Sequence, residues 1–130
     1  MGLIPVQLSV TKDIDGESGI VKLRVNDILF LEAMKKKQCV AFHTLESIFY
    51  LPGSLKYWST TLNNSGYTFR IVDRSNSVNV DKIVRIDNVF KKAYFEYDIR
   101  KGSKCCTMSE QRCSDLVDEF FVTIPGLYLS

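Results

Sequence analysis

Short apolar stretches separated by turn-forming residues recur along the chain, and they restrict its fold more than any other feature. Most are rich in β-branched and aromatic residues or alternate apolar with polar positions, which is typical of short strands with one buried face. The stretches are residues 6–10, 20–25, 28–33, 39–44, 47–51, 69–72, 78–80, 83–86 and 93–97. The sequence therefore predicts a mainly β fold, with several short antiparallel strands in small sheets.

Two segments instead carry apolar residues at helical spacing. The first set is Leu51, Leu55, Trp58 and Leu62. Pro52 predicts the start of this helix, and the polar residues 63–66 predict its end. The second set is Cys113, Leu116, Val117 and Phe120. Ser109 predicts the N-cap of this second helix, so we expect one central and one C-terminal α-helix, each with its apolar side on the core.

The composition is that of an ordinary globular domain of 130 residues, with 45% hydrophobic and 25% charged residues. The formal net charge is only +2, but acidic residues concentrate near the two ends of the chain and leave the middle more basic. Residues 1–5 lack the features of an export signal, and no stretch approaches the roughly 20 apolar residues that span a bilayer. We therefore expect a cytoplasmic protein with no membrane partner.

The residues that usually carry catalysis or bind metals are sparse. His43 is the single histidine and lies in a predicted strand without a recognisable catalytic partner. The four cysteines, Cys39, Cys105, Cys106 and Cys113, match no zinc-ligand spacing, and no glycine-rich phosphate-binding motif occurs. We expect no enzyme activity, no cofactor and no small-molecule substrate. Buried, inert thiols are the simpler reading of the cysteines, and an oxidation switch at Cys106 and Cys113 is the alternative.

Basic and amide side chains occur at the predicted turns and element starts, where side chains project toward a partner. They are Lys35, Lys36, Lys37, Arg74, Asn76, Lys91, Lys92, Lys101, Lys104, Gln111 and Arg112. Lysines suit contacts to DNA phosphates, whereas the flat groups of Arg, Asn and Gln suit base edges in the major groove. The alternative is that these are ordinary solvated charges.

Three passages resemble the LytTR-type DNA-binding domain of bacterial response regulators. Residues 25–33 resemble its opening, in which an Asp-Ile pair precedes an aromatic strand that ends in Glu and a small residue. Residues 54–69 resemble its helix with two spaced leucines and the aromatic residue that follows. The segment from Phe69 to Asn79 resembles its signature. The matching positions there are Phe69, Val72, Arg74, Ser75, Val78 and Asn79, and Ile83 and Ile86 continue the pattern.

This resemblance, over residues 21–120, implies an elongated antiparallel β fold whose loops enter successive major grooves of double-stranded DNA. Two protomers would then bind tandem repeats. The base-reading candidates are Lys37 or Gln38 in the first loop, Arg74 in the signature, and Gln111 or Arg112 at the last helix. Ser75 completes the candidate contacts, and Asn79 is expected to brace the signature loop rather than to touch DNA.

The chain departs from the family pattern at Ile71, Asp73, Asn76 and Gln111. These departures remove expected contacts, so the alternative is a degenerate member that acts as a protein-protein interaction or anti-regulator module. Residues 1–20 are predicted to add a strand and an acidic loop to the same domain, and they are too few for a receiver domain. Residues 121–130 form an apolar tail that either packs on its own domain or makes a dimer contact.

Overall fold

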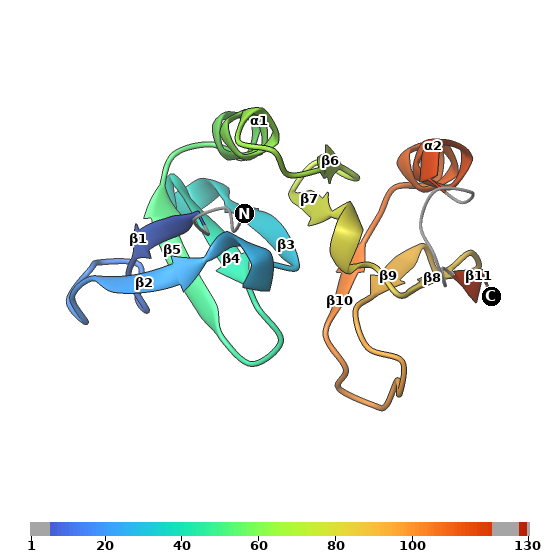
Figure 1. Ribbon diagram of the computed structural model, residues 1–130, viewed down its shortest axis with the longest axis horizontal. Coiled ribbons are helices and arrows are strands. Elements are labelled where there is room, and N and C mark those ends of the chain that lie inside the picture. The colour runs from blue at the N-terminus through green and yellow to red at the C-terminus, as the bar shows by residue number, and fades with distance from the viewer. Residues whose placement is uncertain (1–5, 121–127, 130) are drawn as a thin grey trace, which may run out of the picture.

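The computed structural model describes residues 6–120, 128 and 129, which form three small sheets and two α-helices (Figure 1). The two-stranded sheet pairs β1 (Gln7–Val10) with β2 (Val21–Arg24). The five-stranded sheet has the order β5 (Ile48–Pro52), β4 (Cys39–His43), β3 (Phe30–Met34), β7 (Asn76–Asn79) and β6 (Phe69–Ile71). The four-stranded sheet has the order β10 (Cys105–Thr107), β9 (Lys92–Tyr94), β8 (Arg85–Asp87) and β11 (Tyr128–Leu129).

The helices are α1 (Leu55–Asn64) and α2 (Glu110–Phe120), and short 3₁₀ turns cover Val25–Asp27, Lys35–Lys37 and Val80–Lys82. Every strand pair among the described residues is antiparallel except β8 with β11. The prediction of a mainly β fold with one central and one C-terminal helix is therefore confirmed.

The five-stranded sheet is shared by two hydrophobic cores, because successive residues of a strand point to opposite faces. Leu31 and Phe42 are paired across β3 and β4 and pack in one core with Leu62 of α1. Phe30, one position earlier, packs instead with Val78, with Leu116 of α2 and with the four-stranded sheet. The sheet thus joins the two halves of the molecule, which stand on either side of β7 in Figure 1.

The central helix begins later than the sequence predicts. Pro52 is the last residue of β5, and Ser54 is the N-cap, whose Oγ accepts a hydrogen bond from the Tyr57 N–H at 3.0 Å. The prediction of a start at Pro52 was wrong because β5 is an edge strand, where proline is tolerated. Gly53, at φ +124, makes the turn between them, and a Cβ there would lie 2.9 Å from Nε1 of Trp58.

Two other boundaries differ from the prediction. Val25–Asp27 forms a 3₁₀ turn that Ile28 closes, so β3 starts at Phe30 and not at residue 28. Cys105–Thr107 forms β10, a strand that the sequence pattern did not indicate. The C-terminal helix agrees better, since Ser109 Oγ accepts from the Arg112 N–H at 3.3 Å and the predicted apolar residues pack on the core.

Most of the residues considered for chemistry are buried, and Cys105 is half-buried. His43 is buried, stacks on Phe30 at a centroid distance of 4.2 Å and lies 2.9 Å from Oε1 of Glu32 through its Nε2. Burial lowers the pKa of His43 and raises that of the Cys106 and Cys113 thiols. Neutral, buried thiols are poor nucleophiles, which supports the inert reading of these cysteines.

Two further features are absent from the part of the chain that the structure describes. No helix within residues 6–120 is long and apolar enough to cross a membrane. No group of three His, Cys, Asp or Glu side chains in the same part of the chain is placed to hold a metal ion.

Candidate nucleic-acid interface

The strand register brings several connections to one end of the five-stranded sheet. Met34 at the end of β3 pairs with Cys39 at the start of β4, which in turn pairs with Pro52 at the end of β5. The 35–38 turn and the start of α1 therefore lie at this end. The β6–β7 turn, residues 72–75, lies here too, because the Ser75 C=O accepts from the Ala33 N–H at 2.7 Å.

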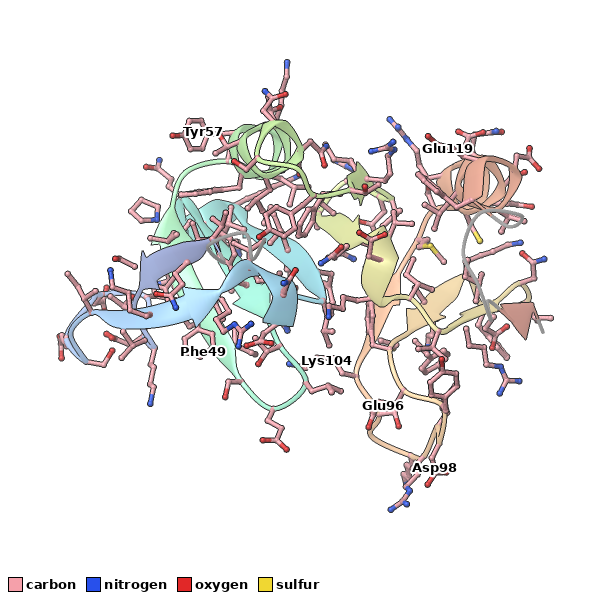
Figure 2. The ribbon with its side chains drawn as sticks, viewed as in Figure 1. Phe49, Tyr57, Glu96, Asp98, Lys104 and Glu119 are labelled. Carbon is pink, nitrogen blue, oxygen red and sulfur yellow. The ribbon has the colours of Figure 1, made fainter. Side chains whose placement is uncertain are left out.

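One end of the four-stranded sheet lies beside this end of the five-stranded sheet. The Ser109 N–H donates to the Val72 C=O at 2.8 Å, so the start of α2 lies against the β6–β7 turn. Thr107 pairs with Lys92, which places the β8–β9 turn at this end as well. The β4–β5 turn and the β9–β10 loop lie at the opposite end, at the bottom of Figure 1. Figure 2 shows Tyr57 and Glu119 near the first end and Glu96 and Asp98 at the other.

Three cationic side chains line an open groove of about 680 Å³ at the first end, between α1 and α2. We call it the cationic groove; its lining residues are Leu55, Lys56, Ile71, Asp73, Arg74, Ser75, Met108, Ser109 and Arg112. Lys56 and Arg112 lie in the first turns of α1 and α2, where unpaired N–H groups and the helix dipole favour an anion. The groove therefore has the electrostatics of a phosphate-binding surface.

The β6–β7 turn at the middle of this groove is held by Asp73. Its Oδ1 accepts from the N–H groups of Ser75 at 2.7 Å and Asn76 at 2.8 Å. Its Oδ2 accepts from Asn76 Nδ2 at 3.2 Å and from Thr107 Oγ1 at 3.3 Å. Arg74 is left exposed at the apex of the turn. The carboxylate is thus committed to fixing the turn that presents Arg74.

Asn76 does not lie on the surface, in contrast to its place among the candidate DNA contacts. It is the first residue of β7, only 7% exposed, and its amide nitrogen donates to Thr107 O at 3.1 Å and Thr107 Oγ1 at 3.0 Å. Because its donors are used inside the fold, this side chain cannot reach a base edge in this conformation. Asn79 is likewise buried and donates to the Ile28 C=O at 2.9 Å, which ties the end of β7 to the segment before β3.

The 35–38 turn carries four exposed side chains: Lys35, Lys36, Lys37 and Gln38. Gln38 has a left-handed backbone, with φ of 53°, and its C=O accepts from the Gly53 N–H at 3.3 Å. This bond ties the turn to the start of α1. The turn is therefore a neighbour of the cationic groove, although none of its residues lines it.

Comparison with known proteins agrees with this geometry. The family model described as LytTr DNA-binding domain matches residues 18–119. The chain belongs to this family. It is therefore a DNA-binding domain at the level of the family. None of the curated proteins matches the chain.

The LytTr fold is also seen in a solved structure. The chain is similar to the LytTr DNA-binding domain of a Bacillus cereus protein described as a methyl-accepting/DNA response regulator. The TM-score is 0.64 at 18% sequence identity, and the match covers 86% of this chain and 94% of the other. At this identity the comparison supports the fold alone.

The remaining candidates of this LytTr domain lie outside the lining of the groove, some near it and some at the opposite end. Gln111 is exposed on α2, and its Nε2 donates to Oδ1 of Asp115 at 3.0 Å. Lys91 and Lys92, half-buried, belong to the β8–β9 turn and its following strand. Lys101 and Lys104 lie in the β9–β10 loop at the opposite end, and Figure 2 shows Lys104 between the two halves.

Two residues were missed or misjudged from the sequence. Lys56 lines the cationic groove, and its position two residues after the N-cap Ser54 is the signal that could have identified it. Asp73 was expected only as a departure from the family pattern. A short acidic side chain two residues before a turn N–H is typical of an Asx-turn, which would have indicated its bracing role.

Proposed function

We propose that this LytTr domain is a sequence-specific transcriptional regulator that reads tandem repeats in double-stranded DNA. The observation that carries the proposal is the convergence of the 35–38 turn, the β6–β7 turn and the start of α2 on one end of the molecule. Loops presented side by side can enter neighbouring grooves of one duplex. Segments that faced different directions could not contact one duplex together.

Phosphate contacts are assigned to the lysines of this end. Lys35, Lys36 and Lys56 are exposed, and Lys56 adds its charge to the N-terminus of α1. Lys91 and Lys92 extend the cationic surface past α2. Such contacts fix the register of the protein on the duplex and supply most of the salt-dependent affinity.

Base reading is assigned to flat or amide side chains at the tips. Arg74 is the first candidate because it is exposed at a fixed turn, and Ser75 beside it adds a hydroxyl. Among the described residues no ion pair involves Arg74, Lys56 or Arg112, so their charges are available to DNA. Lys37 or Gln38, and Gln111 or Arg112, are assigned to the flanking groove positions.

Two protomers bound to two repeats complete the proposed complex. A groove on one side of the duplex recurs after about 34–36 Å, one helical turn, so repeats at about that spacing place both protomers on one face. The backbone of Tyr128–Leu129 pairs with β8 of its own chain, whereas the rest of the apolar tail lies outside the described residues. In this proposal the two protomers associate on the DNA.

Selection of bound duplexes from a random pool tests the proposal. The expected result is enrichment of a repeated motif, with a log-log salt slope near −4 to −5 for about four to six phosphate contacts. If no sequence is enriched and weak binding depends on salt alone, the proposal fails and the protein-binding alternative takes its place.

A further inference from the structure

Two large apolar side chains stand in solvent at the tip of the β8–β9 turn. Val89 is 75% exposed and Phe90 is 72% exposed. The turn beneath them is well defined, since Oδ1 of Asp87 accepts from the N–H groups of Val89 at 2.9 Å and Phe90 at 3.0 Å. Lys91 follows with a left-handed backbone, φ 56°. The fold therefore presents an apolar tip in a fixed conformation, which lowers the entropy lost on binding.

This tip lies beside the start of α2. The Lys91 C=O accepts from the Met108 N–H at 2.9 Å, directly before the Ser109 cap. On the other side of the turn, Asn88 Oδ1 lies 3.8 Å from Sγ of Cys113, in the first turn of α2. The Val89–Phe90 tip therefore flanks the start of α2, where Arg112 is assigned to contact DNA.

Lysines adjacent to the tip favour DNA over an apolar protein surface as its partner. Lys91 and Lys92, both half-buried, directly follow Phe90, and the strand that Lys92 begins pairs with β10, which leads into α2. DNA-bending proteins use the same combination, in which an apolar wedge enters between base steps of the minor groove and neighbouring cations hold the phosphates. The minor groove is the surface next to the major groove that α2 is assigned to enter.

We propose that Phe90, supported by Val89, inserts into the minor groove beside the α2 contact and unstacks one base step, which bends the duplex. This inference rests on the proposed DNA binding and adds to it a wedge residue and a deformation of the DNA. The bend contributes to sequence preference, because flexible pyrimidine–purine steps are unstacked at lower cost than stiff ones.

The test uses the full chain and a selected duplex of about 30 base pairs, with dyes at both ends and 2-aminopurine at successive positions beside the α2 contact. For the wild type we expect closer duplex ends, corresponding to a kink of about 20–90°, and brighter 2-aminopurine at one step. Phe90→Ala should abolish both signals and weaken binding about tenfold, while Phe90→Trp should retain them.

Tyr97→Ala is the matched control, because Tyr97 is 77% exposed but lies in the β9–β10 loop at the opposite end. It should bend DNA like the wild type. If Phe90→Ala binds the duplex and bends it as the wild type does, the wedge is wrong although DNA binding stands. A wild type that binds the duplex without bending it also overturns the wedge alone. A wild type that binds no duplex overturns the proposed function itself.

Discussion

Simple electrostatics and the observed hydrogen bonds predict opposite effects on DNA binding when the Asp73 carboxylate is removed. An acidic side chain in a phosphate-binding groove repels DNA, so its loss should strengthen binding. The structure instead shows four hydrogen bonds to this carboxylate, two of them to the N–H groups of Ser75 and Asn76 at 2.7 and 2.8 Å. We therefore expect Asp73→Ala to weaken both the fold and DNA binding.

The expected magnitude follows from those bonds. A hydrogen bond to a charged group contributes about 1.5–3 kcal/mol to stability, and the two shorter bonds dominate here. Because Asp73 is half-exposed, water replaces part of this loss, and we expect Asp73→Ala to lower the free energy of unfolding by about 2–4 kcal/mol. Release of the turn leaves Arg74 without a fixed position, which should reduce DNA affinity about tenfold, or 1.4 kcal/mol.

Asp73→Asn removes the negative charge but keeps a side-chain oxygen that can hold the turn. Its amide oxygen can still accept from the two backbone N–H groups, so its stability loss should be about 1 kcal/mol and its DNA affinity at least that of the wild type. Urea unfolding and fluorescence anisotropy on the selected duplex measure both quantities. If Asp73→Ala unfolds at the wild-type urea concentration and binds DNA more tightly than the wild type, Asp73 acts only as a repelling charge and does not hold the turn.

Three further predictions concern the fold that supports the groove. Ser54→Ala should lower the free energy of unfolding by about 1 kcal/mol in urea, since Ser54 caps α1; an unchanged midpoint would contradict this role. Phe42→Ala should lower the free energy of unfolding by about 3–5 kcal/mol, because this fully buried ring also packs edge-on against Trp58, with the ring centroids 5.5 Å apart. A loss below about 1 kcal/mol would mean that the neighbouring side chains move in and fill the cavity. Burial lowers the pKa of His43 from 6.5, so the unfolded chain protonates first and stability is lost as the pH falls below about 6.5. Between about pH 7.5 and 5.5 the urea midpoint of the wild type should fall more than that of His43→Gln, and equal falls would assign the effect to other groups.

Local patterns were sufficient to predict most elements of the fold. Alternating and apolar stretches identified the strands of both cores, and the spacing of Cys113, Leu116 and Phe120 identified the buried side of α2. The β10 strand was missed because Cys105–Thr107 is short and carries no alternation that distinguishes it from a loop. This strand is stabilised by pairing with β9, and no local sequence pattern indicates a contact between segments that a long loop separates.

The candidate site was predictable by segment but not by side chain. The sequence indicated the Arg74 turn and the start of α2, but it could not show that Asn76 turns inward to Thr107, 31 residues away. The place of Lys56 beside the Ser54 cap was the one local signal for it, but the groove that it lines forms only when α1 and α2 pack on opposite sides of the β6–β7 turn. Tertiary contacts decide both cases.

The affinity of Arg74→Ala for the selected duplex tests the central claim most directly. Arg100→Ala is the control, because Arg100 is exposed and pairs with Asp98 in the β9–β10 loop at the opposite end. We predict that Arg74→Ala loses about 1–3 kcal/mol of binding free energy on the best site, with relaxed sequence preference at one position, while Arg100→Ala binds as the wild type. Equal affinities for all three proteins would show that the cationic groove is not the DNA-reading surface.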